Sequence, residues 1–336
     1  MAELLTVLAI DGGGIRGIIP ATVLTEIETR TGKRTAELFD LVAGTSTGGI
    51  LALGCVKPGS DGGSQYAASD LAELYEREGH HIFDRSLWHE LVDLDNLAGP
   101  KYPRQGIEAV LEQYFGDAKL SEAVTETLVT SYELETREPW FFARHKAREN
   151  PSEDDFPMRF VARATSAAPT YFEPEEVSNM HPHGGLIDGG VYANNPAMCA
   201  YVETKKLQET GQFNRQIEEV LVVSLGTGQH TRPIHYAAAE DWGLARWAKP
   251  ILDVVFDGVS DTVDHQMTIL CKESDAGDPR YYRFQTELTL GSDDLDDTSA
   301  ANMNALKQQA NELVEAKAND LDRLCRELTA KVGAPV

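Results

Sequence analysis

The sequence predicts an α/β fold in which a mostly parallel central sheet lies between helices on both faces, a three-layer αβα arrangement. Two observations carry this prediction. Short apolar runs rich in β-branched residues alternate with longer helical segments as far as about Leu225. Glycine-rich turns follow two of these runs directly and lead into helices. The chain has 336 residues, enough to bury a large core, and no internal repeat.

The first strand–turn–helix unit opens the chain. Thr6–Ile10 is an apolar, β-branched run and predicts a short buried strand. The glycine-rich run Asp11–Gly17 follows it. Ile18–Arg30 then predicts a helix, with Pro20 tolerated in its first turn and Gly32 just past its end. A strand, a glycine-rich turn and a helix N-terminus together form an arrangement that binds anions.

A dinucleotide is one anion that such a turn can serve, because Gly12–Gly17 fits the spacing G-x-G-x-x-G. That interpretation needs an acidic residue about 20 positions further on, at the end of the second strand. Glu37 is near this spacing, but it precedes the second strand. No Lys-Ser/Thr pair of a P-loop follows the glycines either. The sequence therefore disfavours nucleotide binding at this turn.

The second unit carries a serine at its turn. Leu38–Ala43 predicts a buried strand, and Thr47–Gly54 predicts the start of a helix. Between them, Gly44–Gly48 matches G-x-S-x-G, the pattern of a nucleophile elbow. Such a turn exposes the Ser46 hydroxyl at a helix N-terminus, whose positive potential favours an alkoxide or a tetrahedral oxyanion. The pattern predicts a serine nucleophile.

A carboxylate at a third strand end supplies a base. Leu186 and Ile187 are an apolar pair, Asp188 follows them, and Gly189-Gly190 makes a turn. Aspartate before glycine is in most proteins only a turn former. Here a serine nucleophile needs a proton acceptor, and sites in α/β folds gather at strand ends. Together the three motifs predict acyl transfer from an ester.

On these motifs the chain resembles the patatin-like phospholipases, the lipid acyl hydrolases of plant tubers and many bacteria. The three signatures of that family match Gly12–Gly17, Gly44–Gly48 and Asp188–Gly190. Further segments resemble the family over nearly the whole chain: Ala164–Phe172, Asn194–Pro196, Val223–Gly228, Trp242–Trp247, Ser260–His265 and Asn302–Met303. The resemblance implies a patatin-like three-layer fold, with residues 5–200 as the catalytic core. Residues 201–336 are then expected to add a strand and helices to that fold rather than form an independent domain.

The resemblance also implies the roles of the site residues. It places the catalytic dyad on Ser46 and Asp188 and implies a phospholipase A activity through an acyl-enzyme, with no cofactor and no metal. It places the oxyanion hole on the backbone of Gly12, Gly13 and Gly14, with Arg16 nearby. The supporting glycines of the motifs are Gly17, Gly44, Gly48, Gly189 and Gly190.

Other functions stay open at this point. Within the family, some bacterial members are phospholipase effectors of anti-phage defence that cyclic nucleotides activate, which makes a small regulatory nucleotide an alternative partner. An acyltransferase and a non-catalytic lipid-binding module are further alternatives. An α/β-hydrolase triad would use His230, His235 or His265, but the elbow arrives after only one earlier strand. Malonyl-transferase-like enzymes, which pair serine with histidine, are a closer structural rival.

Charge and composition limit the partners. The formal net charge is −24 and the pI is near 4.7, so the surface should repel nucleic acid and anionic bilayers. A neutral or zwitterionic lipid substrate, met at a transient membrane surface, is the expected partner. We see no basic signal-peptide region and no stretch of about 18 apolar residues, and the four cysteines lie far apart. These features predict free thiols and a cytoplasmic protein, peripheral at membranes. The sequence does not predict an oligomeric state.

Three segments resemble metal sites only superficially. His80-His81 has no partner cluster and predicts a helix surface, and Met180–His183 predicts a loop. Gly291–Asp297 holds four aspartates but lacks EF-hand spacing. The aromatic residues between Phe83 and Tyr102, and the pair Trp242 and Trp247, are candidates for an acyl groove or for a contact with the lipid surface; core packing is the equal alternative.

Overall fold

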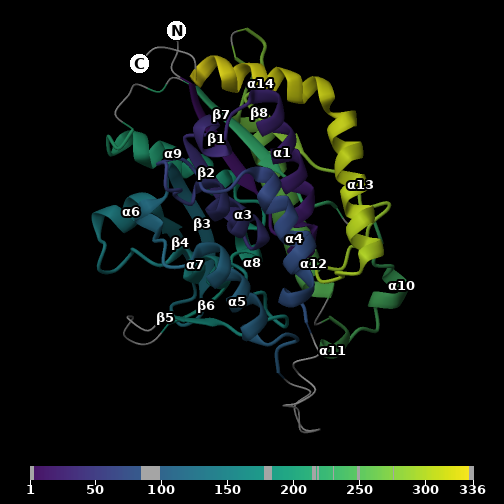
Figure 1. Cartoon of the computed structure of the whole chain (residues 1–336). Coiled ribbons are helices and arrows are strands. Elements are labelled where there is room, and N and C mark those ends of the chain that lie inside the picture. Colours follow the sequence, from purple (N-terminus) through teal and green to yellow (C-terminus); the bar gives the residue numbers. More distant parts are fainter. Residues whose placement is uncertain are drawn as a thin grey trace.

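The computed structural model describes residues 4–84, 99–177, 184–213, 217, 219–229, 231–247, 250–274 and 276–332. One sheet runs through this part of the chain, and helices cover both of its faces (Figure 1). Its eight strands are β1 (Leu4–Ile10), β2 (Leu41–Thr45), β3 (Glu126–Glu133), β4 (Glu138–Ala143), β5 (Glu175–Val177), β6 (Gly184–Asp188), β7 (Glu219–Leu225) and β8 (Tyr281–Phe284).

The strand order is β5-β6-β3-β2-β1-β7-β8, and β4 also pairs with β3. Strands β3, β2, β1, β7 and β8 are parallel to one another, whereas β4 and β6 run antiparallel to β3 and β5 runs antiparallel to β6. The predicted α/β class with a mostly parallel sheet is therefore confirmed. The antiparallel strands lie at one side of the sheet, as is common in mixed sheets.

The register around β3 brings two strand ends together. Strand β4 pairs with β3 from Leu128 to Glu133, so β2 and β6 share the opposite edge of β3. On that edge β2 pairs with β3 up to Thr130, and β6 pairs with it from the next residue, Ser131. Because β2 and β6 run in opposite directions, their C-terminal ends meet beside the middle of β3.

The two faces of the sheet bury separate apolar layers. Alternate residues of β1 point to opposite faces, as a strand requires: Leu8 and Ile10 join one layer, and Val7 and Ala9 join the other. The first layer contains side chains of α1, α3, α4, α5, α7, α13 and α14; the second contains side chains of α9 and Met267 of α12. Three layers result, which agrees with the arrangement expected from the sequence.

The helices are α1 (Ile18–Thr31), α2 (Thr35–Leu38), α3 (Thr47–Val56), α4 (Ala68–Ile82), α5 (Arg104–Phe115), α6 (Arg144–Glu149), α7 (Met158–Thr165), α8 (Gly190–Ala193), α9 (Ala197–Glu209), α10 (Tyr236–Ala239), α11 (Leu244–Trp247), α12 (Pro250–Leu270), α13 (Ala300–Ala316) and α14 (Ala318–Val332). Two short 3₁₀ helices are η1 (Gly14–Gly17) and η3 (Leu120–Glu122).

Most predicted elements near the site are present. The first strand and helix lie where the sequence places them, and Gly32 ends α1 in the left-handed conformation. One boundary was wrong: Leu38 ends the short helix α2, and β2 begins only at Leu41. Glu37 explains the difference, because its carboxylate accepts the Arg34 backbone N–H at 2.8 Å and so caps a helical turn before the strand.

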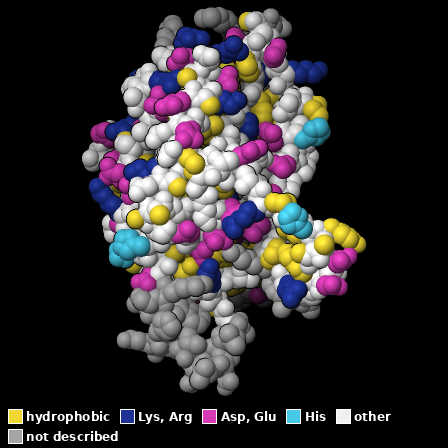
Figure 2. Space-filling view, turned by 90° about the vertical axis from the view of Figure 1, so that its right-hand side faces the viewer, with side chains coloured by type: hydrophobic (Ala, Val, Ile, Leu, Met, Phe, Trp, Pro, Cys, Tyr) yellow, Lys and Arg dark blue, Asp and Glu magenta, His cyan; other side chains and the backbone are white. Residues whose placement is uncertain are grey.

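Charged side chains of both signs are interspersed on the face shown in Figure 2, and hydrophobic ones gather on a projecting lobe at its lower right. In Figure 1, α10 projects from the body of the molecule. Ile234, just before α10, and Tyr236, its first residue, are exposed hydrophobic residues. Within the described ranges, we find no helix with the length and apolar character needed to span a bilayer.

Candidate active site

Ser46 occupies a strained turn between β2 and α3. Its φ is 55° and its ψ is −125°, a left-handed backbone that non-glycine residues rarely adopt. The turn packs closely on β1, because a Cβ at Gly48 would lie 2.1 Å from the carbonyl oxygen of Ile10. The structure therefore shows the elbow geometry that G-x-S-x-G predicts, with the serine side chain almost completely buried.

Asp188 ends β6 and is completely buried. Its Oδ1 accepts the Gly190 backbone N–H at 2.7 Å, while its Oδ2 has no hydrogen-bond partner among the described residues. Burial raises the pKa of Asp188 to about 7, and hydrogen bonding from the Ser46 hydroxyl and from Gly190 partly opposes the rise. The Ser46 hydroxyl thus lies near a carboxylate oxygen without forming a complete hydrogen bond with it.

The sheet register explains why two residues 142 positions apart meet. Thr45, the last residue of β2, pairs with Thr130, and Asp188 pairs with Ser131. Adjacent residues of β3 therefore pair with the last residue before Ser46 and with Asp188 itself. The pairing of the strands brings the two residues together, and the sequence motifs do not show which strands pair.

Hydrogen bonds from buried threonine hydroxyls fix the backbone of the elbow. The Ser46 backbone N–H donates to Thr165 Oγ1 at 2.8 Å, and that hydroxyl donates to the Thr130 carbonyl at 2.6 Å. The Thr45 and Thr130 hydroxyls bond to each other at 2.7 Å. All three threonines are completely buried. Sequence analysis did not assign this role, although Thr165 lies in the segment Ala164–Phe172 that resembles the family.

The glycine loop between β1 and η1 offers two backbone donors rather than three. The Gly12 N–H donates to the carbonyl of Asn194 at 3.0 Å, so it is not free to bind an oxyanion. Among the described residues, the N–H groups of Gly13 and Gly14 have no acceptor. Both glycines line the pocket that contains Ser46. The expectation that Gly12 takes part in the oxyanion hole stays a prediction, and in this structure the carbonyl of Asn194 accepts its N–H.

Arg16 contacts the glycine loop from the buried side. Its guanidinium is buried, its Nε donates to the Gly13 carbonyl at 3.3 Å, and it is not among the residues lining the pocket. Burial lowers its pKa, and the carboxylates of Asp257 and Asp253 on α12 oppose that shift. Arg16 therefore shapes the backbone of the candidate oxyanion hole rather than facing the pocket.

A buried ion pair joins the other end of this loop to β8. The two terminal guanidinium nitrogens of Arg283 donate to the Asp11 carboxylate, at 3.0 and 2.6 Å, and Nη1 also donates to Ser224 Oγ at 2.8 Å. Burial lowers the pKa of Arg283, but the Asp11 carboxylate outweighs it and raises the pKa; burial also raises the pKa of Asp11, and the Arg283 charge opposes that rise. Thr227 adds a hydrogen bond to the Gly12 carbonyl at 2.7 Å. No sequence motif indicates these contacts, which join residues far apart in the chain.

The remaining motif glycines allow close packing. Gly17 lies against the hydroxyls of Thr47 and Tyr75, and Gly44 lies against the backbone at Gly48. Gly189 faces Thr130, and Gly190 contacts Phe256 of α12 and donates to Asp188.

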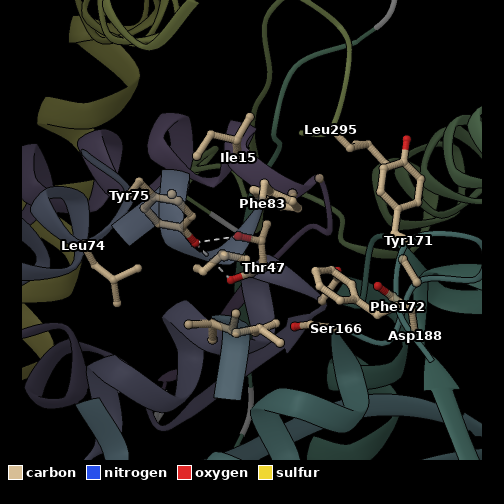
Figure 3. Close-up of a pocket in the computed structure, with 18 of the residues that line it drawn as sticks. Ile15, Thr47, Leu74, Tyr75, Phe83, Ser166, Tyr171, Phe172, Asp188 and Leu295 are labelled. Atoms are coloured by element: carbon tan, nitrogen blue, oxygen red, sulfur yellow. Dashed lines mark hydrogen bonds between the residues drawn. The ribbon is translucent and has the colours of Figure 1, made fainter. Parts of the chain in front are cut away.

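A largely apolar pocket leads away from the candidate dyad (Figure 3). Its empty volume, counted to its open mouth, is about 650 Å³. Ser46, Asp188, Gly13 and Gly14 lie in its wall together with Ser166. The apolar wall comes from η1, α3, α4, α5, α12 and the loops near them: Ile15, Ile50, Leu74, Ile82, Phe83, Ile107, Phe172, Phe256 and Leu295. An apolar lining of this kind suits a hydrocarbon chain better than a polar ligand.

The aromatic candidates are only partly in this pocket. Phe83 lines it, and Tyr102 is buried behind Phe83 with ring centroids 5.3 Å apart. Trp242 and Trp247 contact each other edge to face at 5.2 Å and do not line this pocket, so their contact with the lipid surface stays a prediction. Trp88 lies outside the described residues.

Of the histidines that the structure describes, none lines the pocket that contains Ser46. His235 and His265 are exposed, and His80 and His81 lie exposed on α4 as predicted. His230 and Met180–His183 lie outside the described residues. In the part of the chain that is described, no group of three or more His, Cys, Asp or Glu residues has the arrangement of a metal site. All four cysteines are free thiols.

Comparisons with known proteins identify a family for this chain. The family model of the patatin-like phospholipases matches residues 8–201, more than half of the chain. The chain belongs to the patatin-like phospholipase family. Patatin-like protein 2 of Arabidopsis thaliana is 32% identical over 97% of this chain and 87% of its own length. Patatin-T5 of Solanum tuberosum is 32% identical over 94% and 85%.

Membership in the patatin family supports a lipid acyl hydrolase at the level of the family. One relative in Solanum tuberosum, 31% identical over 95% of this chain and 89% of its own length, bears the name probable inactive patatin-3-Kuras 1. The activity of this chain therefore has to be argued from its own residues. Its match to the family model ends at residue 201, yet Leu225, Thr227, Arg283 and Leu295 all contact the glycine loop.

Proposed function

We propose that this protein is a serine carboxylic-ester hydrolase of the phospholipase A type, with Ser46 as nucleophile and Asp188 as its base. One observation carries the proposal: a buried carboxylate oxygen with no other described partner lies by the hydroxyl of a serine held in an elbow. A carboxylate with a pKa about 7 is a far better proton acceptor than an exposed aspartate.

The reaction has two steps. Asp188 Oδ2 accepts the Ser46 proton while Ser46 Oγ attacks the ester carbonyl carbon, and the amides of Gly13 and Gly14 hold the oxyanion. The tetrahedral intermediate collapses, and the alcohol leaves with the proton from Asp188. Water then transfers a proton to Asp188 and attacks the acyl carbon, which releases the fatty acid and returns the proton to Ser46.

Charges around the pocket favour a neutral or zwitterionic lipid. Burial raises the pKa of Tyr171 above its ordinary value, and Asp296, Asp253 and Asp294 add to the rise. Tyr171 lines the pocket, so these carboxylates lie close to the site, although Lys101 pairs with Asp296 and the Arg16 charge lowers the Tyr171 pKa. Together with the net charge of −24, they disfavour an anionic head group and an anionic bilayer.

The test compares the wild type with Ser46→Ala on phosphatidylcholine and on a p-nitrophenyl ester. We expect the alanine variant to lose activity on both by about 10³-fold or more while keeping its circular dichroism spectrum. Hydrolysis of both substrates by Ser46→Ala at the wild-type rate would rule the proposal out. Regulation by a small nucleotide stays a prediction, which the same assay with and without cyclic dinucleotides tests.

A further inference from the structure

Three consecutive residues connect the backbones of the two candidate catalytic residues. Thr165 Oγ1 accepts the Ser46 backbone N–H at 2.8 Å, and the Ala167 carbonyl accepts the Asp188 backbone N–H at 3.1 Å. Ser166 lies between them in the chain. Hydrogen bonds on both sides therefore fix the position of Ser166 relative to Ser46 and Asp188.

The Ser166 side chain faces the pocket. The residue is only 7% exposed, and it lines the same pocket as Ser46 and Asp188. Figure 3 shows its hydroxyl directed into the pocket. Within the described residues, Ser166 Oγ has no hydrogen-bond partner. Because buried hydroxyls are nearly always hydrogen-bonded, this oxygen points to a partner that comes from the substrate or the solvent.

The neighbouring hydroxyls of the pocket are directed elsewhere. Thr47 and Tyr75 bond to each other at 2.6 Å, and the Tyr75 hydroxyl also lies 3.3 Å from the Thr47 carbonyl. The Tyr171 hydroxyl points away from Asp188 in Figure 3. Among the described residues that line this pocket, Ser166 thus has a buried hydroxyl, besides that of Ser46, that these contacts leave available.

The second step of the proposed reaction needs such a group. Asp188 Oδ1 is held by Gly190, so Oδ2 accepts one hydrogen of the attacking water. One hydrogen bond leaves that water free to rotate. A second acceptor for its other hydrogen directs the oxygen lone pair toward the acyl carbon, and this fixed orientation accelerates attack.

We propose that Ser166 Oγ, together with Asp188 Oδ2, holds the water that hydrolyses the acyl-enzyme; the proposal rests on the proposed function. One water hydrogen passes to Asp188 as the oxygen bonds to the acyl carbon. The bond from that carbon to Ser46 Oγ then breaks, and the proton on Asp188 returns to Ser46. The other hydrogen stays on the water oxygen and leaves with the carboxylic acid. Ser166 neither gains nor loses a proton.

Pre-steady-state hydrolysis of a p-nitrophenyl ester separates the two steps in the full-length protein. In Ser166→Ala we expect the initial burst of p-nitrophenol, which reports acylation, to change by less than about threefold. Steady-state turnover should fall by about 10- to 100-fold. Intact-mass spectrometry should then show an acyl adduct that maps to Ser46. Ser166→Gly should behave in the same way, and Ser166→Thr, which keeps a hydroxyl, should recover most of the turnover.

Ser121→Ala is the matched control, because it removes a serine hydroxyl bonded to Asp155 and lying outside the pocket; both its rates should equal those of the wild type. Equal losses in burst and steady state in Ser166→Ala, or no loss in either, would overturn the role of Ser166. An active Ser46→Ala variant would instead overturn the proposed function. The two failures are therefore distinguishable.

Discussion

At the residue scale, burial of the Asp188 carboxylate raises its pKa and makes it a better proton acceptor. The sequence identifies Ser46 and Asp188, but an aspartate with an ordinary pKa near 4 is a weak base for a hydroxyl. The structure shows what raises that pKa: Asp188 is completely buried, and among the described residues Gly190 alone donates a hydrogen bond to its Oδ1. Burial depends on how β6, α8 and α12 pack, so it is not visible in a short motif. The positions of Ser166 and Thr165 at the site depend on the same packing, so no short motif predicts them.

The raised pKa predicts an acid limb in the pH profile. Asp188 must be ionised to accept the serine proton, and its pKa is about 7. The kcat/KM for a neutral ester should therefore be constant above about pH 8 and fall tenfold per pH unit well below pH 7. Stopped-flow measurement with an uncharged ester checks this. Activity that stays constant down to pH 5 would show that no group of pKa about 7 controls the reaction.

The glycine loop shows, at the scale of an element, what sequence can and cannot predict. The order of strand, turn and helix was predictable from the run Asp11–Gly17. The sequence does not predict which backbone N–H groups of the loop are free. The carbonyl of Asn194 accepts the Gly12 N–H, and the carbonyl of Leu295 accepts the Ile15 N–H. These partners lie about 180 and 280 residues further along the chain, beyond the reach of local patterns.

Substitution of Gly14 tests whether the glycine loop binds the oxyanion. Its φ is +57°, and a Cβ there would lie 2.1 Å from the Leu295 carbonyl oxygen, so Gly14→Ala must displace the backbone. We expect turnover to fall by about 10²-fold, the effect of one lost oxyanion donor. Gly62→Ala is the matched control, since Gly62 also has positive φ but has open space around it. If both variants turn over at the wild-type rate, the loop does not bind the oxyanion.

Helix α4 offers a test of the acyl pocket. Gly79 lines the pocket, and a Cβ there would lie 2.7 Å from Ile15 Cδ1, so Gly79→Ala pushes that side chain into the cavity. Hydrolysis of long-chain esters should fall about tenfold relative to acetate esters, whose short acyl group does not reach this wall. The control is Gly258→Ala on α12, where a Cβ meets nothing. An equal fall for both chain lengths would indicate a packing role instead.

At the scale of the whole molecule, the C-terminal part completes the site. Strands β7 and β8 extend the sheet beside β1, and Arg283 of β8 holds Asp11 at the start of the glycine loop. Leu295 holds the other end of that loop through Ile15. The expectation that residues 201–336 do not form an independent domain stays a prediction, and these contacts are the reason to keep it.

Removing the Arg283 charge should therefore affect both stability and activity. Arg283→Met leaves the buried Asp11 carboxylate unpaired, which costs about 3–5 kcal/mol in comparable pairs. Urea unfolding should show this loss, and ester hydrolysis should fall because the glycine loop loses its anchor. Arg232→Met removes the exposed partner of Asp293 and should change stability by less than about 1 kcal/mol. Equal stability of the two variants would mean that the buried pair is dispensable.

The central claim is that Ser46 is the nucleophile and that Asp188, not a histidine, is its base. The most direct measurement is the rate at which a fluorophosphonate probe labels the protein, with the labelled peptide identified by mass spectrometry. We predict that the label maps to Ser46, that Asp188→Asn slows labelling by about 10³-fold, and that His235→Ala and His265→Ala label at the wild-type rate. Rapid labelling of Asp188→Asn together with slow labelling of a histidine variant would contradict the account.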